Sequence, residues 1–150
     1  MKYRKAVFIL VYAQTKKKIE YLLLKRKLHW KGWEFPKGAI KFFETKKAAV
    51  KRELFEETGL KPIKIKRFNF SGKYPYDRIY SDRPGIKGQT FSLYSAEVKK
   101  RKINLDKIEH FGYKWFTFSD ALKKLKWPNQ KKSLKIVNDW LKNYLKIKNL

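Results

Sequence analysis

Apolar residues in this chain fall into short strand-like runs, separated by polar turns. β-Branched and aromatic residues occupy positions 6–12 and 21–24, and a lysine-rich turn at 16–18 lies between them. Such a pattern is typical of two strands joined by a tight connection. The first part of the chain is therefore predicted to form a β-hairpin.

An uninterrupted helical segment follows near the middle of the chain. Residues 30–36 are aromatic and predicted to be extended, and Lys37-Gly38 predicts a break into a loop. Residues 45–58 are good helix formers without Gly or Pro. Thr45 can serve as the N-cap, and Gly59 stands where a glycine commonly ends a helix. This segment is the clearest helix in the sequence.

The rest of the chain predicts further strands followed by two helices. The predicted strands are 63–70, 72–76, 89–98 and 113–116, and the predicted helices are 119–126 and 129–145. The last helix is amphipathic, with an apolar stripe formed by Leu134, Val137, Trp140, Leu141 and Leu145. This order predicts an α+β fold in which a mixed sheet has helices packed on its faces. No repeat or linker divides the chain, so residues 1–150 are expected to form a single domain.

The charge of the chain points to anionic partners. Lys and Arg number 39 and Asp and Glu number 13, for a net charge of +26 at pH 7, which excludes an acidic metal buffer. Because 43% of the residues are hydrophobic and 17% are aromatic, a disordered basic tail is excluded as well. Only seven of the 39 are Arg, so a compositional bias towards Lys explains the charge as well as a polyanion site does.

Two absences in the sequence bear on location. There is no Cys, which removes disulfides, thiolate metal sites and cysteine nucleophiles and suits a reducing compartment. No apolar run approaches the 18 residues of a membrane span, and the N-terminal residues lead directly into a strand rather than an export signal. We therefore expect a cytoplasmic protein without a membrane partner.

Three carboxylates are concentrated on one face of the central helix. Glu53, Glu56 and Glu57 stand at i, i+3 and i+4, within about 100° of helical arc. Like charges in this arrangement repel one another, and no Lys of this basic chain is interleaved among them. Hard oxygen ligands in such a cluster favour a divalent cation such as Mg²⁺ over a merely solvated acidic surface.

The segment around these glutamates resembles the signature of the Nudix hydrolases at all nine of its constrained positions. In order, these are Gly38, Glu44, Arg52, Glu53, Leu54, Glu56, Glu57, Gly59 and Leu60, spread over 23 residues. The resemblance implies the Nudix fold, an α/β/α sandwich with a mixed β-sheet between helices. It also implies a hydrolase of phosphoric anhydride bonds that uses Mg²⁺ or Mn²⁺.

The resemblance further implies a role for each residue of the signature. Glu53, Glu56 and Glu57 are expected to be catalytic as metal ligands, one of them also activating water, and the carbonyl group of Gly38 is expected to be a further ligand. Structural roles are expected for Glu44 and Arg52, which would orient the loop and helix through an ion pair, and for Gly59. The metal would lower the pKa of a bound water and align it for in-line attack on phosphorus.

Residues outside the signature resemble those of enzymes that cleave diadenosine tetraphosphate asymmetrically to ATP and AMP. Lys37 stands before Gly38 as in those relatives, where it would contact the phosphate chain. Glu109, followed by His110, would be an additional metal ligand or base, with His110 in a packing or hydrogen-bonding role. Tyr76, Tyr80 and Trp127 fall where those relatives hold the adenine between aromatic rings. Diadenosine tetraphosphate is therefore the preferred substrate hypothesis.

A competing hypothesis comes from Lys87-Gly88-Gln89, which resembles a segment of Nudix enzymes that remove pyrophosphate from RNA 5′ ends. The aromatic pattern that follows this segment in those enzymes is only partly present, although the net charge favours RNA. Basic residues in and around the 74–87 loop could grip phosphates, but the sequence does not rank Lys73, Arg78, Arg83 and Lys87.

Two further functions are compatible with the sequence. Inositol pyrophosphates have only the charge of the protein in their favour as substrates. A non-catalytic module that binds RNA or a nucleotide belongs to another functional class, and the intact set of glutamates argues against it. We expect a monomer whose partner is a small nucleotide, with RNA as the second candidate partner.

Overall fold

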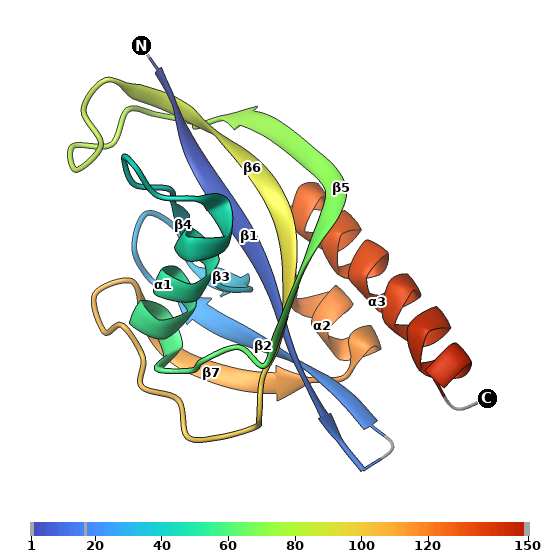
Figure 1. Ribbon diagram of the computed structural model, residues 1–150. Helices are drawn as coiled ribbons and strands as arrows, with labels where there is room; N and C mark the ends of the chain where they lie inside the picture. The colour runs from blue at the N-terminus through green and yellow to red at the C-terminus, as the bar shows by residue number, and fades with distance from the viewer. Residues whose placement is uncertain (1, 17, 149–150) are drawn as a thin grey trace.

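A mixed β-sheet lies between helices in the computed structural model, which describes residues 2–16 and 18–148 (Figure 1). The strands are β1 (Lys2–Thr15), β2 (Lys18–Arg26), β3 (Gly32–Glu34), β4 (Lys37–Ala39), β5 (Lys64–Pro75), β6 (Ile86–Glu97) and β7 (His110–Phe116). The helices are α1 (Lys46–Thr58), α2 (Phe118–Lys124) and α3 (Pro128–Lys148). The α+β class and the mixed sheet predicted from the sequence are confirmed.

Strand β1 is the centre of the sheet and is buried on both of its faces. The order is β3-β2-β1-β6-β5, with β4 also paired to β1 and β7 to β2. β1 runs parallel to β6, whereas the other pairs are antiparallel. Side chains alternate across a strand, so Phe8 and Leu10 join the core cluster under α2 and α3, while Val7 and Ile9 join the cluster under α1.

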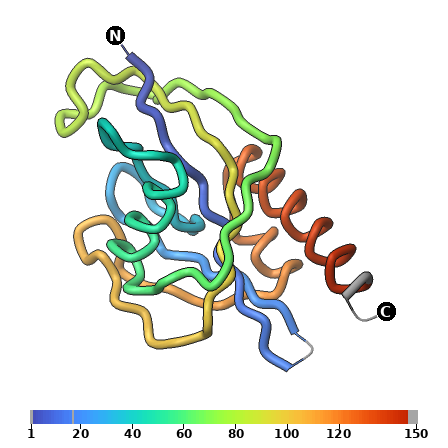
Figure 2. Tube along the Cα trace, viewed as in Figure 1, coloured from blue at the N-terminus to red at the C-terminus, as the bar shows by residue number. Residues whose placement is uncertain are grey.

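Figure 2 shows α1 on one side of the sheet and α2 with α3 on the other, which gives three layers. Among the described residues, no helix is both long and apolar enough to span a lipid bilayer. In α3, the predicted apolar stripe packs against the sheet through Leu134, Val137 and Leu141.

Helix α1 begins and ends where its sequence predicts. The Thr45 hydroxyl accepts a hydrogen bond from the backbone N–H of Ala48 at 3.1 Å, and Gly59 adopts a left-handed conformation with φ 77°. The buried side chains Ala49, Val50 and Leu54 join the core. Burial of this face leaves the neighbouring acidic face of α1 directed along the edge of the sheet.

Several local predictions are corrected by the structure. The loop predicted at Lys37-Gly38 is wrong, because these residues belong to β4 and pair with β1. The two strands predicted at 63–70 and 72–76 are one strand, β5, with an irregular register between Arg67 and Ser71. Both errors have one cause, because pairing with a neighbouring strand decides such short segments more strongly than local preferences do. The turn predicted at 16–18 includes Lys17, which lies outside the described residues.

Candidate active site

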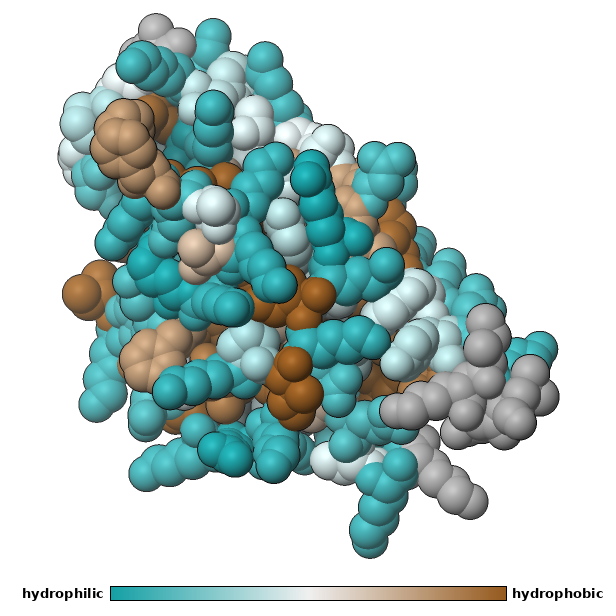
Figure 3. All heavy atoms as spheres, viewed as in Figure 1, coloured by the Kyte–Doolittle hydropathy of each residue, from teal (hydrophilic) through white to brown (hydrophobic). Residues whose placement is uncertain are grey.

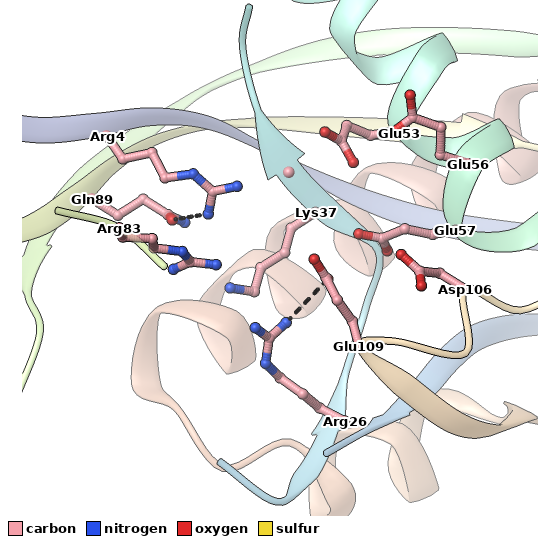
Figure 4. Close-up of a pocket in the computed structure, with 11 residues that line it drawn as sticks. Arg4, Arg26, Lys37, Glu53, Glu56, Glu57, Arg83, Gln89, Asp106 and Glu109 are labelled. Carbon is pink, nitrogen blue, oxygen red and sulfur yellow. Dashed lines mark hydrogen bonds and ion pairs between the residues drawn. The ribbon is translucent and has the colours of Figure 1, made fainter. Parts of the chain in front are cut away.

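A pocket of about 110 Å³ opens at the end of α1, between the helix and strands β1, β4 and β6 (Figure 4). Its lining consists of Arg4, Arg26, Lys37, Gly38, Glu53, Glu56, Glu57, Arg83, Gln89, Asp106 and Glu109. Figure 4 shows an acidic wall from α1 and the loop before β7, opposite a basic wall that carries Arg4 and Arg83. Lys37 lies between the two walls. The pocket therefore presents carboxylates and cations to the same small volume.

The acidic wall is assembled by backbone hydrogen bonds to the last turn of α1. The N–H of Asn104 donates to the carbonyl oxygen of Thr58 at 2.8 Å, and that of Asp106 donates to Glu57 at 3.3 Å. The carbonyl oxygen of Glu109 accepts from the N–H of Lys27 at 2.9 Å. These bonds bring Asp106 and Glu109, distant in sequence, against the glutamates of α1.

Among the carboxylates of this wall, Glu57 has the pKa that its surroundings change most. Its side chain is buried, and its Oε2 atom has no hydrogen-bond partner among the described residues. Burial raises the pKa of Glu57 well above its usual value, and the charges of Glu34 and Glu109 raise it further. An unpartnered, buried anionic oxygen facing other carboxylates is the environment that a divalent cation would neutralise.

Arg52 holds the other two glutamates on the acidic face of α1. Its Nη1 atom lies 2.8 Å from Glu53 Oε1 and 3.2 Å from Glu56 Oε2, and burial raises the pKa of Glu53 while Arg52 opposes that rise. No three acidic or histidine side chains within 2–16 and 18–148 converge closely enough to hold a metal ion as they stand. A cation would compete with Arg52 for the oxygens of Glu53 and Glu56, which are of the hard type that Mg²⁺ prefers.

Arg52 also fixes the loop that precedes α1. The predicted ion pair with Glu44 is present, with Nε of Arg52 2.6 Å from Glu44 Oε2 and Nη2 2.8 Å from Oε1. Hydrogen bonding to Arg52 lowers the pKa of Glu44 to about 2. Nη2 also donates to the carbonyl oxygen of Ala39 at 2.8 Å. One guanidinium thus ties β4, the loop and the acidic face of α1 together.

Gly38 leaves room for Glu53. A β-carbon built on Gly38 would collide with the Glu53 carboxyl group, so only glycine allows this side chain to lie against β4. We expect Gly38→Ala to displace Glu53 and lower kcat about 100-fold, the cost of misplacing a reacting group by about 1 Å. The matched control is Gly112→Ala, because a β-carbon at Gly112 meets only Lys25 Cβ at an ordinary 3.7 Å. Steady-state kinetics of both variants provide the measurement, and wild-type turnover in Gly38→Ala would contradict this placement of Glu53.

A buried ionic network lies beneath the basic wall. The carboxyl group of Glu34 is fully buried, 2.9 Å from Arg26 Nη1, 2.8 Å from His110 Nε2 and 3.7 Å from Lys37 Nζ. Burial alone would raise the pKa of Glu34, but Lys37, His110 and Arg26 bring it down to about 2. Burial lowers the pKa of Lys37, and Glu34 opposes that change. Glu34 thus holds cationic side chains that line the pocket.

A second network holds the far side of the basic wall. Arg4 and Gln89 are partners in the parallel register of β1 and β6, and Arg4 Nη1 donates to Gln89 Oε1 at 3.3 Å. The Tyr76 hydroxyl donates to the same oxygen at 3.1 Å and accepts from Arg83 Nη1 at 2.9 Å. Gln89 is buried, and its Nε2 donates to Tyr74 at 2.9 Å. The positions of both guanidinium groups therefore depend on one buried amide.

The structure brings most of the proposed site residues together in the pocket lining, but the three proposed aromatic residues lie outside that lining. Gly38, Lys37, the three glutamates of α1 and Glu109 line the pocket, with Glu109 Oε2 3.5 Å from Arg26. Tyr76 contacts the pocket through Gln89, and Tyr80 packs on Tyr76 with ring centroids 5.3 Å apart. Trp127 instead packs edge-on against Trp30 at 5.5 Å, outside the pocket lining.

The structure also ranks the basic residues that the sequence left equal. Arg83 lines the pocket, whereas Arg78 is 70% exposed and pairs with Asp77. Lys73 and Lys87 both lie over the ring of Tyr3. His110 is buried and hydrogen-bonded to Glu34, in line with the packing or hydrogen-bonding role predicted for it.

Some residues of the pocket escaped sequence analysis. Arg4, Arg26 and Asp106 belong to no local motif. Pairing of β1 with β6 and of β2 with β7 places the two arginines, and a backbone hydrogen bond to Glu57 places Asp106. The sequence singles out Gln89, but as a marker of substrate rather than as a support for Arg4. In the structure, Gln89 lies in the basic wall and accepts a hydrogen bond from Arg4.

The NUDIX domain family matches residues 2–136, which is most of the chain. The chain belongs to the Nudix family. The RNA pyrophosphohydrolase of Baumannia cicadellinicola subsp. Homalodisca coagulata is 32% identical over 108 residues, covering 65% of this chain and 68% of that protein. The 8-oxo-dGTP diphosphatase of Buchnera aphidicola subsp. Schizaphis graminum is 34% identical over 97 residues, covering 65% and 64%. This Nudix chain thus spans about two thirds of the length of these relatives.

A solved structure confirms the predicted Nudix fold. The binary complex of Ap4A hydrolase from C. elegans superimposes with a TM-score of 0.75 at 22% identity, covering 93% of this chain and 98% of that one. The chain is a Nudix pyrophosphohydrolase, and Nudix hydrolases generally use a divalent cation such as Mg²⁺. Four residues of the Nudix signature, Gly38, Glu53, Glu56 and Glu57, line the pocket at the end of α1.

Proposed function

We propose that this Nudix hydrolase removes pyrophosphate from the 5′-triphosphate end of RNA. The observation that carries the proposal is the two-sided pocket, in which buried Gln89 fixes Arg4 and, through Tyr76, Arg83 opposite the glutamates of α1. Gln89 belongs to the segment that resembles RNA-end pyrophosphohydrolases, and a relative of that name is 32% identical. The net charge of +26 would add attraction for a polyanionic chain.

The acidic wall would hold the metal and the attacking water. Glu53, Glu56 and Glu57 would bind a divalent cation, with Gly38 and Glu109 as further candidate ligands. When bound, the cation supplies charge neutralisation at the phosphate oxygens and lowers the pKa of water. A glutamate carboxylate accepts the proton of the attacking water as the new oxygen–phosphorus bond forms. The bond from the attacked phosphorus to the oxygen that bridges the α and β phosphates breaks, which releases pyrophosphate and leaves RNA with a 5′-monophosphate.

The basic wall would position the phosphate chain. Arg4 and Arg83 present planar guanidinium groups that bind phosphate oxygens in pairs, and Lys37 adds a point charge between the walls. Binding and orientation of three linked phosphates would therefore be their role.

Arg83 and Arg78 offer a matched pair for testing this role. Both belong to the loop between β5 and β6, but only Arg83 lines the pocket. We expect Arg83→Ala to raise KM for triphosphorylated RNA about tenfold, because one charge-assisted contact worth about 1.5 kcal/mol is lost. Arg78→Ala should leave KM within about twofold, as is usual for exposed ion pairs. Equal KM values for the two variants would remove Arg83 from the site.

Hydrolysis of diadenosine tetraphosphate is the second candidate, favoured by aromatic rings beside the basic wall. His29, Tyr80 and Tyr76 form a series of ring contacts at 4.1 and 5.3 Å that leads to Arg83. Such rings stack on bases with about 1–3 kcal/mol per base. Lys37 also resembles a residue of the enzymes that cleave this substrate. Because it would bind any phosphate chain, it does not distinguish the two candidates.

Turnover with Mg²⁺ at physiological salt separates the two candidates. The substrates are triphosphorylated RNA, diadenosine tetraphosphate and 8-oxo-dGTP, with products resolved by chromatography. The proposal expects pyrophosphate and monophosphorylated RNA at a kcat/KM at least about tenfold above the others, a difference of about 1.4 kcal/mol in transition-state binding. Faster release of ATP and AMP from the dinucleotide would establish the second candidate. Absence of turnover on all three would contradict both and favour a binding-only role.

A further inference from the structure

Two adjacent phenyl rings stand almost fully exposed in the loop between β4 and α1. Phe42 is 86% exposed and Phe43 is 93% exposed, and their ring centroids lie 4.0 Å apart. Figure 3 shows apolar atoms over this loop, surrounded by hydrophilic side chains. Both rings stay outside the two core clusters, so they contribute little to folding.

The backbone of this ring pair is strained. Phe43 has φ 67°, in the left-handed region that disfavours residues with a β-carbon and is unusual for a bulky side chain. Burial of the Phe43 ring does not offset the strain, since this ring lies in water. A strained conformation that exposes a large apolar side chain is a feature more often found at binding surfaces than at neutral ones.

The loop that carries the ring pair is anchored to the pocket wall by hydrogen bonds and ion pairs. The N–H of Lys41 donates to Glu44 at 3.0 Å, which closes the loop, and Glu44 pairs with Arg52. Arg52 in turn contacts Glu53 and Glu56, which line the pocket. The loop that carries the rings is thus connected through Glu44 and Arg52 to glutamates of the pocket wall.

The surroundings of the rings select an anionic partner. Exposed lysines flank them in sequence at 41, 46 and 47, and the Lys46 ammonium donates to Ser92 of β6. A second copy of a chain with a net charge of +26 would be repelled. Aromatic rings bordered by lysines are the usual means of binding single-stranded nucleic acid, where bases stack and phosphates meet cations.

We propose that Phe42 and Phe43 form a stacking platform for unpaired bases of the RNA strand whose 5′ end occupies the pocket. The proposal rests on the proposed function only for the identity of the strand. The platform would bind bases without reading their sequence, because every base has a face that can stack. It would favour ends with several unpaired nucleotides over ends paired to the last base.

Binding of RNA without a 5′-phosphate tests the platform separately from hydrolysis. The probe is a fluorescent, single-stranded 5′-hydroxyl RNA, followed by anisotropy at physiological salt. Phe42→Ala combined with Phe43→Gly should raise its Kd about tenfold, the loss of one stacked base. Glycine is chosen at 43 because it accepts a positive φ. The control is Phe55→Ala, which removes an exposed phenyl ring from α1 and should change Kd less than about twofold.

An abasic oligonucleotide of the same length isolates stacking from charge. Its Kd should be the same for the wild type and the double variant, since the phosphates remain and the bases are gone. Equal affinity of the two proteins for the 5′-hydroxyl RNA would overturn the platform. The platform would also be overturned if the double variant lost binding to anionic lipid vesicles while its affinity for RNA stayed unchanged.

Kinetics then separate failure of the platform from failure of the proposed function. On triphosphorylated RNA with unpaired 5′ nucleotides, the double variant should raise KM and leave kcat unchanged. RNA hydrolysis with the same KM in both proteins would overturn the platform alone. RNA binding that depends on the rings, in a protein that does not hydrolyse RNA, would support the platform and contradict the proposed function.

Discussion

Glu57→Gln is expected to lower kcat by about 100- to 1,000-fold, the range seen when one preorganised group is removed from a charged transition state. The amide keeps the shape of the side chain but removes the negative charge of the buried, unpartnered Oε2 atom. Steady-state turnover with Mg²⁺ measures the loss. The control is Glu20→Gln, a carboxylate outside the pocket that pairs with Lys100, and its turnover should be unchanged.

Stability measurements distinguish lost chemistry from lost folding in this variant. Because burial raises the pKa of Glu57, the folded chain holds its proton more tightly than the unfolded chain, and the charged form costs stability at neutral pH. Glu57→Gln should therefore unfold at the same or a higher urea concentration than the wild type in metal-free buffer at pH 7. Added Mg²⁺ should raise Tm more for the wild type than for the variant. Wild-type turnover in Glu57→Gln would remove this glutamate from the mechanism.

Glu34→Gln is expected to destabilise the fold by about 3–5 kcal/mol, the usual cost of removing one partner from a buried ion pair. The change would leave Arg26 without its charged partner at 2.9 Å and Lys37 without the carboxylate at 3.7 Å. Urea unfolding at pH 7 measures the difference from the wild type. Glu20→Gln, at a partly exposed pair, should cost less than about 1 kcal/mol.

The dependence of this difference on pH follows from the lowered pKa. A carboxylate whose pKa falls from its usual 4.5 to about 2 on folding contributes stability above about pH 4.5 and loses it as pH falls towards 2. The gap between wild type and Glu34→Gln should therefore be constant from pH 7 to about pH 5 and narrow below it. A gap that does not change down to pH 3 would contradict the ionised state of Glu34.

A second substitution tests whether the cost comes from the charge left unpaired. Arg26→Met in the Glu34→Gln background removes the partner as well, so part of the lost stability should return. Stability is the readout here because Arg26 lines the pocket and its loss would alter activity by another route. A double variant no more stable than Glu34→Gln would show that packing rather than charge dominates at this position.

Local sequence patterns predicted the central helix and its acidic face. Thr45 and Gly59 are capping residues whose preferences arise from the nearest turn of backbone, and both adopt the predicted conformations. The spacing of Glu53, Glu56 and Glu57 places them together by helix geometry alone. The nine-position signature then predicted the family, and the match of the NUDIX domain family to residues 2–136 confirms that prediction.

Residues brought together by strand pairing could not be predicted in the same way. β4 is three residues long and exists because β1 offers it partners, so no local preference marked it. Arg4 meets Gln89 only through the register of β1 and β6, and Arg26 meets Glu34 through the pairing of β2 with β3. The sequence likewise could not separate Arg83 from Arg78, since the path of a loop decides which of two similar side chains enters the pocket.

Residues close together in the chain were enough to predict the family, the helix that carries the carboxylates and a preference for a divalent cation. The cations that face those carboxylates, and the way Glu34 and Gln89 hold them, could be seen only in the folded protein. Long-range electrostatic partners are set by sheet register and burial, which spacing along the chain does not encode.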